Sequence, residues 1–193
     1  MADPEIVAAR ETLAHFGRLY GGAGVLPVAV DDVAESLLGL RIVECADIAA
    51  SGVLYPHLRE VRVNSAECAS VPLRRRFTIA HEIGHWVLHA QAAGSSARFC
   101  RITDVPEQPR DPREREANRF AAELLMPEAS IRAEVARRGL EPDLLAGLYA
   151  VSPLAMRWRL FNLELSGERP DQVGSAPNSA STSAASSSSG PIA

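Results

Sequence analysis

The sequence predicts an α+β fold, in which a short mixed or antiparallel sheet packs on one long helix and further helices follow. Two observations predict this class. Three short strand-like runs lie close together between residues 40 and 64, and helical patterns dominate the chain before and after them. Strands that cluster, instead of alternating with helices, indicate α+β rather than α/β architecture.

Two helices are predicted before the strands. Apolar residues recur at helical spacing from Glu5 to about Tyr20, and a glycine-rich segment ends the pattern. A second helix is predicted over Val30 to Leu38, and Gly39 closes it. The predicted strands then follow, at Leu40 to Glu44, Ser51 to Tyr55 and Glu60 to Asn64.

The rest of the chain is predicted to be helical, apart from one loop and a tail. A long helix begins at Pro72, with Ser70 as its N-cap, and runs to about residue 90. Residues 94–113 contain Gly, Ser and three prolines and are interpreted as a loop. A helix over 114–126 follows, and shorter helices are expected within 130–165.

We therefore expect one domain over residues 1–165 and a separate tail over residues 166–193. The tail is rich in Ser and Ala. Such a segment cannot bury enough apolar surface to offset its conformational entropy, so we expect it to be disordered.

The composition excludes several classes of protein. A net charge of −4 argues against a nucleic-acid coat protein. Three cysteines are dispersed without C-x-x-C spacing, which indicates reduced thiols rather than a disulfide framework. The acidic N-terminus is not a secretion signal, and no apolar run is long enough to cross a bilayer. We therefore expect a cytoplasmic protein.

The motif HEIGH at residues 81–85 carries the predicted chemistry. On a helix, His81 and His85 lie one above the other on the same face, so that both imidazoles can bind one zinc ion. Glu82 lies about 100° round the helix from His81 and can take a proton from a water molecule without binding the metal. Gly84 allows another element to approach the helix closely. The motif predicts zinc-dependent hydrolysis.

A catalytic zinc site needs a third protein ligand and an open fourth position. His89 follows the motif too closely, and without the intervening glycine, to be the third histidine of an H-x-x-G-x-x-H pattern. We interpret it as a polar residue at the helix end or a partner of a metal-bound side chain. The alternative third ligand is a carboxylate from a downstream helix.

Glu114 and Glu116 compete for this place, and the predicted helix face decides between them. Glu116 lies on a face predicted to be solvated, together with Arg119 and Glu123, and is expected to form a surface ion pair with Arg119. Because a ligand must face inward, Glu114 is predicted to complete the site, and Asn118 to hold a metal-bound histidine. Glu114 shares its face with apolar residues predicted to face the core: Ala117, Ala121 and Leu125.

Two segments resemble the ImmA/IrrE family of metallo-endopeptidases: RFTIAHEIGHWVLH at residues 76–89 and EREANRFAAELLMP at residues 114–127. The resemblance extends from about Val25 to Leu165. It implies a small zincin-like domain of the gluzincin type, with Zn²⁺ as cofactor. It also implies a bacterial or phage enzyme that cleaves a helix-turn-helix transcriptional repressor and so switches on its genes. Some relatives carry an additional DNA-binding or sensor domain, whereas this chain is expected to be a stand-alone catalytic domain.

Two features of the predicted site remain open. The residue that stabilises the oxyanion is not identified by the sequence, and the candidates are Tyr55, Tyr149 and Arg159. The predicted strand from Glu60 to Asn64 is expected to form the rim of the cleft and to pair with an extended substrate.

A second hypothesis is a non-proteolytic, zinc-containing regulatory protein that binds a repressor or DNA. The predicted helices from Asp143 to Tyr149 and from Pro153 to Phe161 resemble a helix-turn-helix in outline, and Arg157 and Arg159 could reach phosphate. A structural zinc site normally has four protein ligands, whereas this one has three and a catalytic glutamate. The sequence therefore favours the peptidase, with no membrane association and no direct binding of nucleic acid.

Overall fold

The structure is a computed structural model that describes residues 3–21, 24–90, 98–100, 111–167 and 169–170. The predicted first helix is confirmed as α1 (Pro4–Tyr20), and Gly21, with a φ of 75°, follows its last turn. The predicted second helix is confirmed as α2 (Val30–Asp32), which continues directly into a π-helical turn, η1 (Val33–Leu37).

The sheet contains the three predicted strands and one more. The strands are β1 (Arg41–Cys45), β2 (Gly52–Tyr55), β3 (Glu60–Asn64) and β4 (Arg98–Cys100), and a short 3-10 turn, η2 (Pro56–Leu58), joins β2 to β3. Their order in the sheet is β1-β3-β2-β4. β3 is parallel to β1 and antiparallel to β2, and β2 also pairs antiparallel with β4. This mixed sheet confirms the predicted α+β class.

Two predictions about the sheet are wrong. Residues 98–100 form a strand inside the segment predicted as a loop, because pairing with the edge of β2 imposes an extended conformation that the local sequence does not indicate. β3 is not the rim of a cleft, since it pairs with β1 on one side and β2 on the other. Its backbone hydrogen-bonding groups are therefore used within the sheet and cannot receive a substrate strand.

A short helix that the sequence analysis missed, α3 (Ser65–Ser70), connects the sheet to the long helix. Asn64 caps α3, because its Oδ1 accepts a hydrogen bond from the backbone N–H of Ala66 at 3.0 Å. The long helix, α4 (Pro72–His89), begins at the predicted residue and ends close to the predicted one. The prediction that Ser70 is the N-cap of α4 is wrong. Ser70 is the last residue of α3, and its hydroxyl donates a hydrogen bond to the carbonyl oxygen of Ala66 at 2.9 Å.

Helix α4 lies at the centre of the fold. Its Ile79 and Ile83 are fully buried in one core with apolar side chains of the sheet, Leu54, Val61 and Val63. Helix α5 (Pro112–Leu125) packs against α4 at Gly84, where a Cβ atom would lie only 3.1 Å from the Cα of Ala117. The prediction that Gly84 permits a close approach is confirmed.

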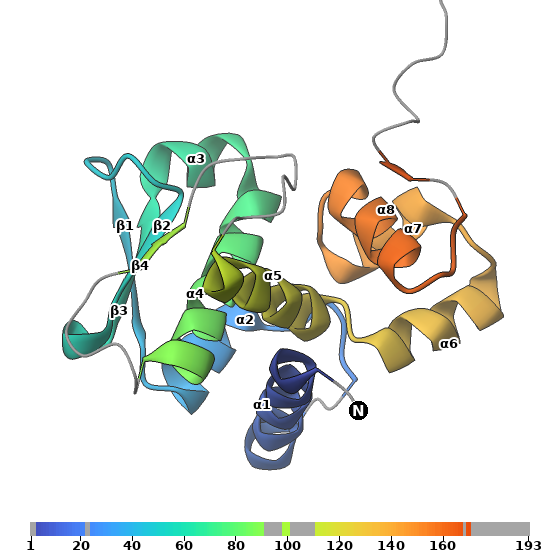
Figure 1. Cartoon of the computed structure of the whole chain (residues 1–193), viewed down its shortest axis with the longest axis horizontal. Coiled ribbons are helices and arrows are strands. Elements are labelled where there is room, and N and C mark those ends of the chain that lie inside the picture. The colour runs from blue at the N-terminus through green and yellow to red at the C-terminus, as the bar shows by residue number, and fades with distance from the viewer. Residues whose placement is uncertain (1–2, 22–23, 91–97, 101–110, 168, 171–193) are drawn as a thin grey trace, which may run out of the picture.

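The predicted short helices are confirmed as α6 (Glu128–Arg138), α7 (Pro142–Tyr149) and α8 (Pro153–Asn162). Figure 1 shows them grouped at one end of the molecule, with the sheet at the other end and α4 and α5 between. Within the described ranges, no helix combines the length and the apolar character that crossing a membrane requires.

Residues beyond the predicted domain boundary at residue 165 still contact the C-terminal helices. The guanidinium of Arg169 lies 5.6 Å from the ring centroid of Trp158, and Pro170 is buried. The predicted disordered tail lies outside the described residues from position 171 onward. The division into residues 1–165 and 166–193 stays a prediction.

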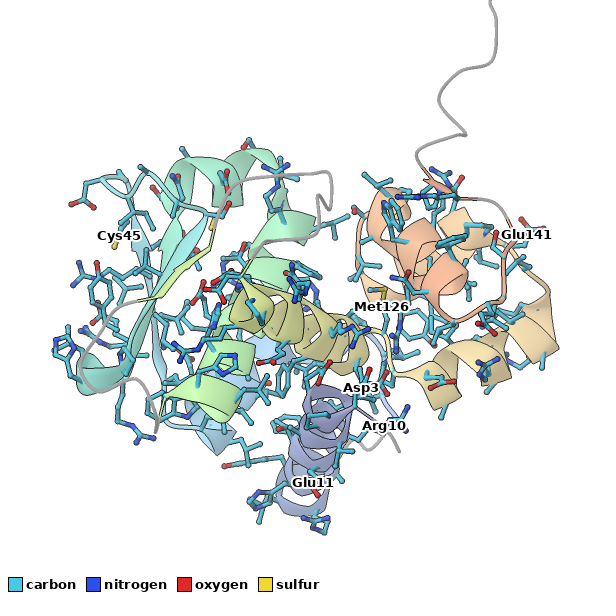
Figure 2. The ribbon with its side chains drawn as sticks, in the orientation of Figure 1. Asp3, Arg10, Glu11, Cys45, Met126 and Glu141 are labelled. Atoms are coloured by element: carbon cyan, nitrogen blue, oxygen red, sulfur yellow. The ribbon has the colours of Figure 1, made fainter. Side chains whose placement is uncertain are left out.

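A buried ion pair joins the C-terminal helices to α5. Glu123, predicted to lie on a solvated face, is 1% exposed. Its carboxylate accepts hydrogen bonds from Arg159 of α8 and, at 2.7 Å, from Arg10 of α1. Arg159 also donates to the carbonyl oxygen of Met126 at 3.0 Å, and Figure 2 shows Arg10 and Met126 close to this junction. The prediction failed because the pattern of α5 does not reveal that distant helices cover this face.

Candidate metal centre

The three side chains predicted as metal ligands meet between α4 and α5. His81 and His85 lie on the buried face of α4, and Glu114 lies in the first turn of α5. The Nε2 atoms of the two histidines are 3.0 Å apart. The Oε2 atom of Glu114 lies 3.1 Å from Nε2 of His81, and its Oε1 atom lies 3.1 Å from Nε2 of His85. No other group of His, Cys, Asp and Glu donors with this potential occurs among the described residues.

This donor set fits a zinc ion. Tetrahedral coordination at the usual zinc–nitrogen and zinc–oxygen distances places neighbouring donor atoms about 3.3 Å apart. The observed separations of 3.0 and 3.1 Å are close to that value. Two unprotonated imidazole nitrogens repel each other at such a distance, and a cation between them relieves the repulsion. Two histidines and one carboxylate are also typical ligands of catalytic zinc.

The local electrostatics favour the protonation states that bind metal. Burial by itself would raise the pKa of Glu114, but hydrogen bonds and charges from His81 and His85 outweigh burial and lower that pKa to about 2. Burial lowers the pKa of His85 below its usual value. At neutral pH, Glu114 is therefore an anion and His85 a neutral imidazole, as metal ligation requires.

Asn118 lies one turn after Glu114 and contacts the first histidine. Its Oδ1 atom is 2.9 Å from Nδ1 of His81. Since an amide oxygen only accepts hydrogen bonds, Nδ1 carries the proton and Nε2 keeps its lone pair for a metal. The prediction that Asn118 holds a ligand histidine is consistent with this contact.

Glu82 lies beside the three donors without being one of them. Its side chain is fully buried, and neither carboxylate oxygen has a hydrogen-bond partner among the described residues. Burial raises the pKa of Glu82 to about 8; the charge of the neighbouring His81 opposes this shift and that of Glu114 adds to it. A buried carboxyl without a partner destabilises a fold, and such groups are concentrated at functional sites.

Glu116, the rival third ligand, lies outside the donor cluster. Its side chain is 43% exposed, and its Oε2 atom is 3.4 Å from Nε2 of His89. The predicted ion pair with Arg119 is wrong. Arg119 instead pairs with Asp3 at 2.7 Å and Glu5 at 2.9 Å, because α1 packs along α5.

His89 lies in the last turn of α4 and connects that turn to the start of α5. It is buried, and its ring centroid is 5.5 Å from that of His85. Its Nε2 atom is 3.4 Å from the carbonyl oxygen of Arg113, the residue before Glu114. His89 is a polar residue at the helix end, as interpreted from the sequence, and it contacts the turn that carries Glu114.

Two of the three oxyanion candidates are occupied elsewhere. Tyr149 is fully buried, and its hydroxyl pairs with that of Ser130 at 2.7 Å. Arg159 is buried in its ion pair with Glu123. Tyr55 ends β2, where the guanidinium of Arg62 lies 4.7 Å from its ring centroid, and it stays a candidate.

The sequence analysis missed one wall of the site, the backbone of β2. A Cβ atom at Gly52 would lie 3.3 Å from Oε1 of Glu82, so this strand lies directly against the carboxylate. An isolated glycine beside an otherwise apolar strand indicates such a close backbone approach, and the sequence contained that signal.

Comparison with known proteins adds a family and a fold. A peptidase family model described as the IrrE N-terminal-like domain matches residues 46–161, more than half of the chain. A search of curated proteins produced no significant match. A solved structure of a Mycobacterium tuberculosis transcriptional regulator is similar with a TM-score of 0.54 at 20% identity, over 80% of this chain and 46% of that one. The chain thus spans about half the length of that regulator, and at this identity the similarity shows the fold alone.

Proposed function

The chain belongs to the ImmA/IrrE family of metallopeptidases, and on this basis we propose that it is a zinc-dependent endopeptidase that cleaves a helix-turn-helix transcriptional repressor. One observation carries the proposal. The donor atoms of His81, His85 and Glu114 converge at 3.0 to 3.1 Å beside the buried, unpartnered carboxyl of Glu82. Three such ligands leave a fourth position open, as in catalytic zinc sites of the gluzincin type.

In this proposal, His81, His85 and Glu114 hold a zinc ion, which when bound lowers the pKa of a water molecule and polarises the scissile carbonyl. Glu82 accepts the proton of the attacking water and passes it to the amine that leaves when the C–N bond breaks. Burial raises the pKa of Glu82 to about 8 in the metal-free site, and the charge of a bound zinc ion would lower that pKa again and favour the carboxylate form that accepts the proton. Asn118 keeps the ring of His81 in its orientation throughout.

The substrate is proposed from the family resemblance and from the exposure of the site. His81 is 2% exposed, and Glu82 and His85 are 0% exposed. Among the four site residues only Glu114 has a partly exposed side chain, at 23%, so we propose that the substrate reaches the site as a narrow, extended segment rather than as a folded surface. A repressor that acts on DNA also implies that the enzyme works in the cytoplasm.

Metal analysis tests the proposal directly. The purified protein should contain about one zinc per chain, and removing the zinc with a chelator should abolish cleavage of a repressor encoded beside its gene. Adding zinc should restore cleavage. Glu82→Gln should keep the zinc and lose hydrolysis, since Glu82 is not a ligand. Cleavage that survives complete zinc removal would exclude the proposal.

The rival hypothesis of a regulatory DNA-binding protein has less support. Arg157 pairs with Asp143 at 2.8 Å, and Arg159 is buried against Glu123. The buried Arg159 is thus not presented to phosphate, and the 39% exposed Arg157 would have to give up its ion pair with Asp143 to bind one. Binding of the isolated protein to DNA that weakens steeply with salt would favour the rival hypothesis.

A further inference from the structure

Gly52 of β2 has no conformational need to be a glycine. Its φ lies outside the left-handed region that favours glycine. It is paired on both sides, with Val63 of β3 and with Cys100 of β4. Glycine inside a strand weakens that strand, because it adds conformational entropy to the unfolded chain and packs no side chain. The reason for a glycine at this position must therefore lie in the space around it.

That space is filled by two side chains of α4. A Cβ atom at position 52 would lie 2.4 Å from Cγ2 of Thr78 and 3.3 Å from Oε1 of Glu82. The first distance is far inside van der Waals contact, and the second is tight. Thr78 is 3% exposed and Glu82 is 0% exposed, so neither side chain can turn outward into solvent.

Thr78 and Glu82 are four residues apart on α4 and therefore lie one above the other on the same face. Both occupy the space in which a Cβ atom of residue 52 would lie. The strand cannot retreat from them without breaking its hydrogen bonds to β3 or β4. The position of the Glu82 carboxyl is thus limited from one side by backbone that is itself held in a sheet.

We infer that Gly52 and Thr78 are positioning residues for Glu82: the bare backbone of β2, with the methyl group of Thr78 beside it, sets where the carboxyl of Glu82 lies relative to the metal ligands. The inference rests on the proposed function, in which Glu82 carries the proton. A side chain at position 52 would displace the carboxyl or the strand, and a displacement of about 1 Å in a catalytic group lowers the rate about a hundredfold.

The test compares Gly52→Ala with a variant that restores the space. In zinc-loaded Gly52→Ala, kcat on fluorescein-labelled casein should fall roughly a hundredfold. Zinc content and KM should change little, because the metal ligands lie on α4 and α5. Adding Thr78→Ser removes the Cγ2 atom that the new Cβ meets, so the double variant should recover most of the lost kcat. Thr78→Ser alone is the reference for that double variant.

Gly147→Ala is the matched control, because a Cβ at Gly147 of α7 has no atom within 4 Å. It should leave kcat unchanged. Wild-type kcat in Gly52→Ala would overturn the inference. A double variant no more active than Gly52→Ala would also overturn it.

Melting temperatures provide a readout that needs no substrate. Gly52→Ala should lower the Tm, and this loss should become smaller in backgrounds that carry Thr78→Ser or Glu82→Ala, since each removes an atom that the new Cβ approaches. Strictly additive effects on Tm would overturn the inference even if casein is not cleaved. A failure of the proposed function would give a different result. Glu82→Gln would then be as active as the wild type, while the effects of Gly52→Ala and Glu82→Ala on Tm would still be non-additive.

Discussion

The Oδ1 atom of Asn118 on α5 lies 2.9 Å from the Nδ1 atom of His81 on α4, so that one helix fixes the ring of a proposed metal ligand on the other. The contact also determines the tautomer of His81, because an amide oxygen can only accept the proton of Nδ1. The Nδ1 atom of His85 is buried without a hydrogen-bond partner in the described part of the chain. Among the described residues, a side-chain hydrogen bond at Nδ1 therefore orients the ring of His81 but not the ring of His85.

Asn118→Ala should weaken zinc binding about 10- to 100-fold, because the ring of His81 would lose its orienting hydrogen bond. Competition with a chromophoric chelator measures this affinity without any substrate. Asn118→Asp keeps an acceptor oxygen at the same place and should bind zinc more tightly than Asn118→Ala. Equal affinities for the Ala variant and the wild type would show that this hydrogen bond does not orient the ligand.

Glu114→Ala should abolish stoichiometric zinc binding and cleavage, whereas Glu116→Ala should retain both. The physical reason is the position on α5: Glu114 reaches both histidines at 3.1 Å, while Glu116 is 43% exposed on the side of His89. Zinc content of the two purified variants decides between them. Zinc lost from Glu116→Ala and kept in Glu114→Ala would reverse the assignment of the third ligand.

His89→Ala should lower zinc affinity, though less than Glu114→Ala does. His89 contacts the carbonyl oxygen of Arg113 at 3.4 Å, so its removal loosens the turn that carries Glu114. The same substitution at the exposed His57, in the turn after β2, is the control and should leave zinc affinity unchanged. Equal zinc affinities of the two variants, measured by chelator competition, would show that His89 does not support the turn that carries Glu114.

Glu123→Ala should lower the free energy of unfolding by about 3–5 kcal/mol, because it leaves Arg159 buried without its anion. The side chains of this pair are 2% and 8% exposed. Chemical denaturation measures the change. The double variant Glu123→Leu/Arg159→Met removes both charges and should be more stable than Glu123→Ala. Glu134→Ala breaks only exposed ion pairs on α6 and should change stability little.

The elements of this fold could be predicted because each carries its own pattern. The spacing of apolar residues predicted α1, α4 and α5 to within a few residues of their ends, and β3 to the residue. The site was predicted in the same way. Four-residue spacing places His81 and His85 on one face of any helix, and the inward stripe of α5 selected Glu114 over Glu116.

Other features were decided by contacts between segments far apart in the chain. Strand β4 exists because β2 offers it an edge, and Glu123 is buried because α1 and α8 cover α5. A local pattern reports which face of an element is apolar, but it carries no information about which distant element will cover that face.

The sequence by itself thus predicted most of the helices and three of the four strands, and it supplied the proposed site: the pair of histidines, the glutamate between them and Glu114 as third ligand. The tertiary structure alone decided what surrounds these groups: the amide of Asn118 on His81, the backbone of Gly52 against Glu82, and the burial that raises the pKa of Glu82 to about 8. The reason is physical. The kinds of donor atoms and their spacing along a helix are local properties, whereas desolvation and the placement of a carboxyl within an ångström depend on the packing of the whole fold.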